Sequence, residues 1–267
     1  MGYCYRYDGT FPGFLCAVRD IYQYHEPPER FLLSDDLTPT LFEERWIATK
    51  PGLAARVYDR LHLRLGRKGL LMVEEGFLTC VPDREVLLFQ FIDFGLTVGK
   101  GVERRLDSHV VLELGKAVRH LQRECELLTG FVRFSDYDGL LVGEISPKNR
   151  VLPILKVHFC DRLAGEAFLL FDRTHGEALL HRPGETVIVP AQDFQAPAPG
   201  QEERAYRALW RRFYDTIAIQ GRYNPKLRQN HMPKRYWKHL TEFQEDDKPP
   251  APQERRGRLA GPQSASV

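Results

Sequence analysis

Long hydrophobic runs are missing from this sequence of 267 residues. The longest apolar stretch runs from Val86 to Phe94, and it is interrupted by Gln90 and Asp93. A membrane-spanning helix needs about 20 apolar residues in succession. The first residues also lack the basic and then apolar layout of a secretory signal. We therefore expect a cytoplasmic protein with no membrane partner.

Paired cysteines and familiar catalytic motifs are missing as well. No Cys-x-x-Cys pair occurs among the five cysteines, which are Cys4, Cys16, Cys80, Cys125 and Cys160. This spacing argues against a zinc ribbon and the three-cysteine cluster of a radical-SAM enzyme, and the odd number of cysteines and the absent signal argue against a disulfide framework. The sequence has no P-loop, no His-Glu-x-x-His and no Gly-x-Ser-x-Gly. Asp136 and Asp138 are better explained as turn residues than as metal ligands, so we expect no cofactor and no metal.

The first 130 residues have mainly helical periodicity. Alternating tyrosines predict a strand over 3–7, and the apolar spacing that follows predicts a helix over 11–22. Short extended segments come next, with the best strand at 46–49. Further helices are predicted over 53–65, 69–80, 84–96 and 107–128, and Gly130 is the expected stop of the last one.

From residue 131 the apolar pattern changes to a period of two, which is typical of strands. Asp138-Gly139 predicts a hairpin turn. Strands are expected over 131–134, 140–145, 167–171, 178–180 and 186–189, and a helix over 151–163. Residues 131–190 should therefore form a small antiparallel sheet that carries one helix.

These elements predict an α+β fold with a helical N-terminal half. Residues 1–243 form either one compact domain or two tightly packed lobes, which would be 1–130 and 131–243. The composition of 244–267 is rich in Pro, Arg, Gln and Ser and predicts a disordered tail.

Charge is unevenly distributed, although the whole chain has a net charge of only +2. Residues 202–243, which we call the C-terminal segment, contain ten Lys and Arg against four Asp and Glu, a net charge of +6. Residues 1–201 contain 24 against 28, a net charge of −4. The C-terminal segment also holds eight aromatic residues. Because cations neutralise phosphates and rings stack on exposed bases, this segment is a candidate nucleic-acid surface.

A helix is predicted over 202–219 in the C-terminal segment. Tyr206, Trp210 and Phe213 recur there at the spacing of a core-facing stripe, and we expect them to pack in the core. Both base stacking and core packing stay open for the aromatic residues outside this spacing, which are Tyr223, Tyr236 and Trp237.

An ordered loop is predicted over 221–235, because Pro225 and Pro233 interrupt regular structure. A basic loop of this kind can grip phosphates through Arg forks, and a loop wrapped over the body of the protein is the alternative. The expected nucleic-acid-binding residues are Arg222, Tyr223, Asn224, Lys226, Arg228, His231, Lys234, Arg235, Tyr236, Trp237 and Lys238.

Few residues qualify as catalytic candidates. Tyr7 and Asp8 lie on the predicted first strand and its turn, and His231 and His239 lie in the C-terminal segment. Half-buried strand tyrosines and hydrogen-bonded structural histidines are the alternative roles for these residues. The sequence leaves open whether Tyr7-Asp8 and the loop around 223–239 form one site.

Two motifs resemble the signatures of a bacterial family of DNA metabolism or DNA repair proteins. Residues 223–240 are YNPKLRQNHMPKRYWKHL, similar to the family's C-terminal signature, and residues 7–18 are YDGTFPGFLCAV, similar to its N-terminal one. Pro12 stands where that signature has a polar residue. The resemblance covers about residues 3–243.

Members of that family are typically encoded beside a radical-SAM protein, and a related domain of unknown function occurs fused to uracil-DNA glycosylase-like domains. The resemblance therefore implies a role in DNA repair or DNA metabolism with a radical-SAM protein as partner. It supplies no catalytic residue. The leading hypothesis is a DNA-binding accessory protein. The alternatives are an enzyme acting on damaged or modified DNA and a scaffold that binds the partner but not DNA.

Overall fold

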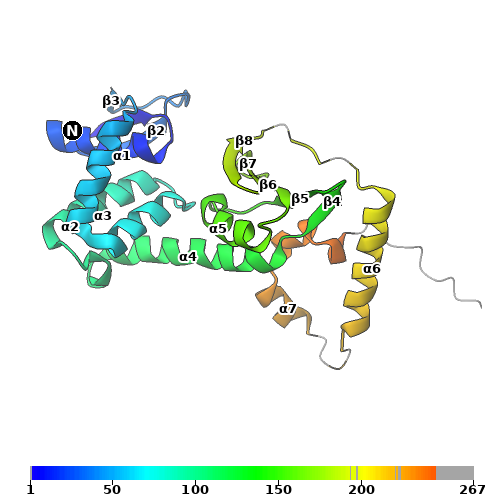
Figure 1. Cartoon of the computed structure of the whole chain (residues 1–267). Helices are drawn as coiled ribbons and strands as arrows, with labels where there is room; N and C mark the ends of the chain where they lie inside the picture. Colours follow the sequence, from blue (N-terminus) through cyan, green and yellow to red (C-terminus); the bar gives the residue numbers. More distant parts are fainter. Residues whose placement is uncertain (1, 193, 197, 220, 222–223, 245–267) are drawn as a thin grey trace, which may run out of the picture.

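The computed structural model has the α+β fold expected from the sequence (Figure 1). Its buried side chains form two hydrophobic cores. Helix α4, His109–Phe131, belongs to both, because Val118 lies in the first core and Leu121 in the second. We call the parts around these cores the N-terminal and C-terminal lobes. The residues that the structure describes are 2–192, 194–196, 198–219, 221 and 224–244.

A parallel sheet of three strands begins the N-terminal lobe. Its central strand β1, Tyr3–Tyr7, confirms the predicted first strand and pairs with β2, Pro28–Leu33, and β3, Glu43–Trp46. Helix α1, Phe11–Tyr24, crosses over from β1 to β2, as a parallel connection requires. Because β2 and β3 lie on opposite sides of β1, the sheet has a topological switch point at the carboxyl end of β1.

The strand predicted over 46–49 is misplaced. Strand β3 ends at Trp46, the N–H of Ile47 donates to the Arg6 carbonyl at 2.8 Å, and Pro51 begins the next helix. The sequence of β3 is Glu-Glu-Arg-Trp, a polar run that strand propensity disfavours. Apolar pattern alone therefore places this strand too late.

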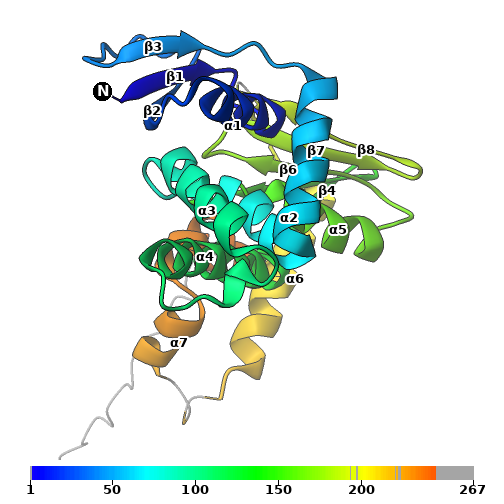
Figure 2. The same cartoon turned by 90° about the vertical axis from the view of Figure 1, so that its left-hand side faces the viewer.

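Helices α2, Pro51–Phe77, and α3, Arg84–Val98, pack with α4 around the first core. Figure 2 shows the arrangement of the three helices. The helices predicted over 53–65 and 69–80 form one element that bends at Gly66, where φ is 74° and ψ is 173°. Glycine adopts such angles without the clash of a side chain. No helix in the described part of the chain is both long and apolar enough to span a membrane.

Helix α4 continues past its predicted stop at Gly130. It follows a short 3₁₀ turn, η1, Val102–Arg104, and it ends at Phe131, whose ring lies 5.6 Å from that of Tyr236. This packing extends the helix into the second core, where a glycine stop is not needed. The strand predicted over 131–134 is displaced for the same reason.

The second sheet has five strands in the order β4-β5-β6-β7-β8. Strands β5 and β6 are parallel and all other neighbours antiparallel, so the prediction of a purely antiparallel sheet is wrong. Helix α5, Leu152–Arg162, confirms the predicted helix but connects β5 to β6 as a crossover, which makes them parallel. The bounds are β4 Phe134–Tyr137, β5 Leu140–Ile145, β6 Ala167–Asp172, β7 Glu177–Arg182 and β8 Glu185–Pro190.

The hairpin turn between β4 and β5 is confirmed. Asp138 and Gly139 both have positive φ, at 52° and 89°. These angles belong to a two-residue type I′ turn, whose twist matches that of the flanking strands. Asp136 supports the turn by accepting the N–H of Gly139 at 2.8 Å, which is the turn role expected for it.

The described residues of the C-terminal segment fold into helices along the C-terminal lobe. Helix α6, Gln201–Ile217, confirms the helix predicted there. The loop predicted over 221–235 contains a helix, because the Asn224 side chain caps it by accepting the Leu227 N–H at 3.0 Å. Arg222, Tyr223 and almost all of the tail predicted over 244–267 lie outside the described residues. The remaining elements are α7, Pro225–His231, and the 3₁₀ helices η3, Lys234–His239, and η4, Thr241–Phe243.

Candidate functional site

Tyr236, one of the predicted nucleic-acid contacts, lies inside the second core. Its side chain is only 2% exposed, and its hydroxyl donates to the Glu124 carboxylate at 3.2 Å. Burial, with the nearby Glu124 charge, raises the pKa of Tyr236 to about 12. The Arg235 guanidinium pairs with the same carboxylate at 3.0 Å. Tyr236 therefore has no face on which a base could stack, and Arg235 serves a structural ion pair.

Trp237 belongs to a second structural cluster. Its ring stacks on Phe243 with centroids 4.5 Å apart and an interplanar angle of 16°. The Arg228 guanidinium lies over both rings, 5.1 Å and 5.4 Å from their centroids. The indole N–H also donates to the Met232 carbonyl at 3.0 Å. These contacts hold α7 against η3 and η4, so Trp237 and Arg228 bind other parts of the protein.

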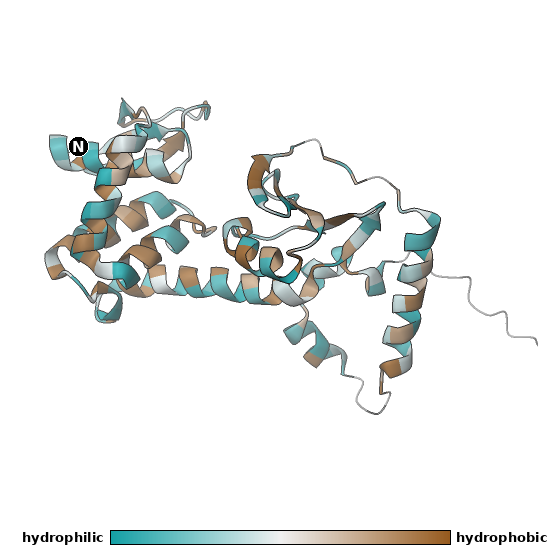
Figure 3. Ribbon diagram, in the orientation of Figure 1, coloured by the Kyte–Doolittle hydropathy of each residue, from teal (hydrophilic) through white to brown (hydrophobic). Residues whose placement is uncertain are grey.

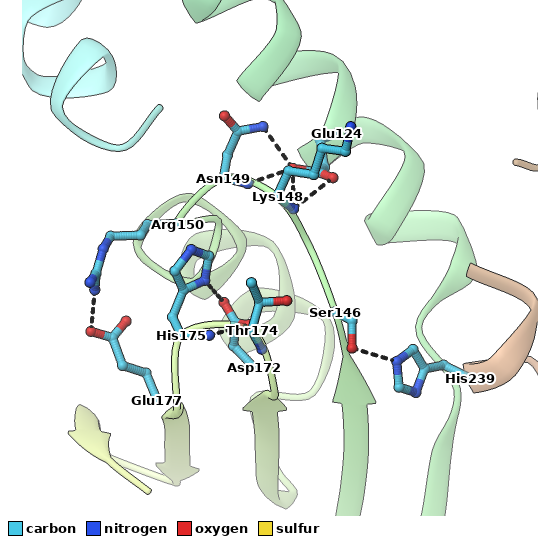
Figure 4. Close-up of polar contacts among 10 residues, drawn as sticks. All are labelled: Glu124, Ser146, Lys148, Asn149, Arg150, Asp172, Thr174, His175, Glu177 and His239. Atoms are coloured by element: carbon cyan, nitrogen blue, oxygen red, sulfur yellow. Dashed lines mark hydrogen bonds and ion pairs between the residues drawn. The ribbon is translucent and has the colours of Figure 1, made fainter. Parts of the chain in front are cut away.

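The Glu124 carboxylate organises the loop that follows β5 (Figure 4). It is 1% exposed and accepts the backbone N–H groups of Lys148 and Asn149 at 3.1 and 2.9 Å. The Asn149 amide adds a contact of 2.7 Å. Burial opposes ionisation, but these hydrogen bonds and the Arg235 charge outweigh it and lower the pKa of Glu124. The anion thus fixes this loop to α4 and to η3.

His239 is a structural histidine with a direct partner. Its Nε2 lies 2.9 Å from the Ser146 hydroxyl, at the end of β5 (Figure 4). Burial, assisted by the positive charge of Lys238, lowers the pKa of His239 to about 4. The ring is therefore neutral at pH 7. His231, in contrast, is exposed at the end of α7 and lines a groove between α6 and α7.

Helix α6 turns its charged face inward. Arg211 is 9% exposed, and Arg207 pairs with Glu203 at 2.8 Å and donates to the Ser135 hydroxyl at 2.5 Å. The surface beneath α6 is itself polar, since it includes Ser135 on β4 and Glu242 on η4. The inner face of the helix therefore contacts mainly polar groups, and Tyr214 adds one aromatic contact, with its ring centroid 5.9 Å from that of Phe243.

The apolar stripe of α6 faces outward as a result. Tyr206 is 68% exposed, Trp210 40% and Phe213 50%, so the prediction that these rings pack in the core is wrong. Leu209 and Ile217 extend the same exposed stripe. Figure 3 shows hydrophobic and hydrophilic residues along this helix. Besides the paired Arg235, the exposed cations of the C-terminal segment include Arg204, Arg212, Lys226, Lys234 and Lys238.

Tyr7 and Asp8 line a separate cleft between the lobes, with a volume of about 630 Å³. Tyr7 is buried and donates to Glu85 at 2.7 Å. Burial and the Glu85 charge raise the pKa of Tyr7. Burial also opposes ionisation of Asp8, but hydrogen bonds from Thr10 outweigh it and lower the pKa of that carboxyl. Arg150 and Glu177 form part of the opposite wall and pair at 2.5 Å.

The cleft and the C-terminal segment do not form one site. The described part of 223–239 contributes no residue to the lining of the cleft. His239 lines a polar pocket beside β4, and His231 lines the groove by α7. Figure 2 shows β1 at one end of the molecule and α7 at the other. A catalytic centre that combines Tyr7, Asp8, His231 and His239 is therefore absent from the described residues.

A histidine–carboxylate pair at the end of β6 was not predicted from the sequence. The buried Asp172 carboxylate lies 2.6 Å from Nδ1 of His175, and it accepts the backbone N–H groups of Thr174 and His175 at 2.9 and 3.2 Å (Figure 4). Such a carboxylate fixes the imidazole and leaves Nε2 for chemistry. The signal was an Asp-x-x-His spacing directly after a predicted strand. No group of three or more potential metal ligands occurs among the described residues.

Comparisons with known proteins give one result. A family model described as a domain of unknown function, DUF4130, matches residues 82–242. The match covers more than half of the chain, from just before α3 to η4, and it includes the whole second sheet. No curated protein and no solved structure matches the chain.

Proposed function

The chain belongs to the DUF4130 family, a family of unknown function, and we propose that it is a nucleic-acid-binding accessory protein of DNA repair or DNA metabolism. The observation that carries this proposal is the inverted orientation of α6. The helix uses Arg207 and Arg211 for inward contacts and exposes the rings of Tyr206 and Phe213. This exposed face, with the exposed cations around it, is the proposed interface.

Charge supports a polyanionic ligand for this interface. Exposed cations of the C-terminal segment outnumber its exposed acids, since Glu203 and Glu242 pair with Arg207 and Arg133. Each cation that neutralises a DNA phosphate releases condensed counterions, which drives binding and makes it sensitive to salt. The exposed rings add stacking on unpaired bases, which tolerates any sequence. Arg228, Arg235, Tyr236 and Trp237 contribute by holding the interface in place.

The role in DNA repair and the radical-SAM partner rest on the resemblance of residues 7–18 and 223–240. One observation favours a second function, that of a scaffold. Leu209 is 62% exposed and Ile217 57%, and neither side chain has a ring on which a base could stack. Exposed apolar patches of this kind mark surfaces where proteins meet. In this alternative the partner enzyme covers the exposed apolar stripe of α6. The exposed cations of the C-terminal segment then contact acidic residues of the partner around that stripe.

Fluorescence anisotropy of labelled single-stranded and duplex DNA at two salt concentrations tests the proposal. The test variant combines Arg212→Glu with Lys226→Glu, because both side chains are exposed and make no described contact that the fold needs. The matched control combines Arg119→Glu with Arg123→Glu, which changes the charge equally at two exposed arginines of α4. We expect salt-sensitive binding that the test variant weakens about tenfold or more and the control leaves nearly unchanged.

Two results would reject this function. Equal affinity of the test and control variants would show that the C-terminal segment does not contact DNA. No binding of the native chain at low salt would leave the scaffold as the better function, and a pull-down with the neighbouring radical-SAM protein would then test it. In that pull-down, Leu209→Ser with Ile217→Ser should abolish capture.

A further inference from the structure

A second cationic surface lies on the N-terminal lobe, along the first half of α2. Arg56, Arg60 and Arg64 follow one another at spacings of four residues, which places them on one side of the helix, and Arg67 and Lys68 follow just past the bend at Gly66. All five are exposed, and Asp59 is the only acidic residue between the first and the last. We call them the α2 stripe, and they are Arg56, Arg60, Arg64, Arg67 and Lys68.

Few contacts within the protein use these cations. In the described part of the chain, no ion pair or side-chain hydrogen bond holds Arg56, Arg60 or Lys68. Arg64 only reaches the Leu96 carbonyl, at 3.5 Å. The stripe continues past the bend at Gly66, where the side chain of Lys100 packs over the glycine. The stripe therefore presents a concentrated positive charge on a lobe whose overall sequence is not basic.

An apolar pocket of about 400 Å³ opens beside the stripe, between α1, α2 and α3. Arg60, Arg64 and Arg19 from α1 are among the residues that line this pocket. Its walls are mostly hydrocarbon, and Leu63 on its edge is 68% exposed. The apolar residues that line it are Val18, Tyr22, Val57, Leu61, Leu63 and Leu96. The Tyr22 hydroxyl is already bonded to Asp93 at 3.0 Å, so its ring is held in place.

The pocket and the stripe together restrict the chemistry of a ligand. A free phosphate would leave the apolar walls of the pocket exposed to water. A fatty acid has a single carboxylate and would pair with only one of the cations. Duplex DNA keeps its bases stacked and out of reach. A single strand offers both features in one chain, because each unpaired base has two apolar faces and is flanked by phosphates. The walls offer few hydrogen-bonding groups, so they would not select one base.

We propose that the α2 stripe and its pocket bind single-stranded nucleic acid, with an unpaired base in the pocket and the flanking phosphates on Arg60 and Arg64. This inference rests on the proposed nucleic-acid function but uses a different surface from α6. It also names the substrate class as a single strand. The two surfaces lie at opposite ends of α4 (Figure 1), so a strand that contacts both runs along the molecule.

The test compares three labelled oligonucleotides of equal length on the full chain. One is an intact single strand, one is an abasic strand with the same phosphates, and one is a duplex. We expect the intact strand to bind roughly tenfold more tightly than the abasic strand, the scale of one stacked base. Leu63→Asn, an exposed and neutral change, should reduce that difference without altering the affinity for the abasic strand, and the difference that remains belongs to the rings of α6.

Charge removal separates this surface from the one on α6. Arg60→Gln with Arg64→Gln should weaken both single strands about tenfold and lower the salt slope by about 1.4, because two phosphates are no longer neutralised. Arg119→Gln with Arg123→Gln on α4 is the matched control, because both are exposed arginines outside the stripe. Circular dichroism checks that every variant is folded.

Each other outcome overturns the inference in a different way. If Arg212→Glu with Lys226→Glu weakens binding but the Arg60 and Arg64 changes do not, the proposed function stands and the α2 site fails. Equal affinity for the intact and abasic strands would show that no base occupies the pocket. Binding of anionic phosphatidylserine vesicles, abolished by the Arg60 and Arg64 changes and without any DNA binding, would assign the stripe to a membrane surface.

Discussion

Two parts of the C-terminal segment are similar in composition, but their aromatic side chains differ in burial. Residues in η3 and η4 and residues in α6 are both basic and rich in aromatic side chains. In η3, Tyr236 is buried against Glu124. In α6, Tyr206 is 68% exposed and the charged face packs inward. Composition therefore indicates that the segment is unusual, and only the packing shows which half is structural and which half is free to bind.

The difference follows from what each part covers. Helix η3 lies over the second core, where it contacts a buried carboxylate and the ring of Phe131. Helix α6 covers Ser135 and Glu242, which are polar. A polar floor attracts arginines, so the rings of Tyr206 and Phe213 turn to solvent, while the Trp210 indole N–H donates to Glu242 at 3.1 Å. The surface beneath a helix thus decides which of its faces is available for function.

Removing one ring from each part should give the largest contrast. Tyr236→Ala leaves a cavity in the second core and removes a hydrogen bond to Glu124, so we expect a loss of about 4 kcal/mol in the free energy of unfolding. Tyr206→Ala should cost less than about 0.5 kcal/mol, as surface changes usually do. Urea denaturation measures both. Similar losses for the two variants would mean that α6 packs its rings inside.

Removal of the buried anion should have the next largest effect. Glu124→Ala leaves the amides of Asn149 and the Arg235 guanidinium without their acceptor, and we expect a loss of about 3 kcal/mol in the free energy of unfolding. Glu126→Ala, an exposed neighbour on α4, is the matched control and should cost little. Thermal unfolding followed by circular dichroism reports the difference. An unchanged melting temperature for Glu124→Ala would contradict the structural role of η3.

The pH dependence of stability should show a smaller effect from His239. Its folded pKa of about 4 lies below the ordinary value near 6.5, so the unfolded chain binds a proton first as the pH falls. Stability from this group is complete above about pH 6.5 and is lost progressively between pH 6.5 and 4. His239→Gln should flatten that part of the curve, and His231→Gln at an exposed site should not. Equal slopes for the native chain and His239→Gln would reject the buried, neutral ring.

Local signals in the sequence predicted many elements of the fold. Alternation identified β1, helical spacing identified α1 and α6, and Asp138-Gly139 identified a type I′ turn. Non-local choices were missed. Nothing in the local pattern distinguishes a crossover through α5 from a hairpin, so the parallel pairing of β5 with β6 was not predicted. Gly130 is a helix stop only when no core contact lies beyond it, and Phe131 provides one.

The candidate site was predicted as a segment but not residue by residue. The basic and aromatic character of 202–243 was visible in the sequence. Tyr236 had no periodicity that could reveal a partner 112 residues away at Glu124. The α2 stripe was hidden because residues 1–201 are acidic on average, although its spacing is local. The Asp172–His175 pair was also within reach of a local search.

Photo-crosslinking tests most directly whether α6 is the free half of the segment. A single strand that carries 5-bromodeoxyuridine is irradiated with the full chain, and the crosslinked peptides are mapped by mass spectrometry. We expect crosslinks on Tyr206, Trp210 or Phe213 and none on Tyr236 or Trp237. Crosslinks on Tyr236 or Trp237 with α6 unlabelled would contradict the proposed interface, because Tyr236 is buried and the Trp237 ring is stacked on Phe243.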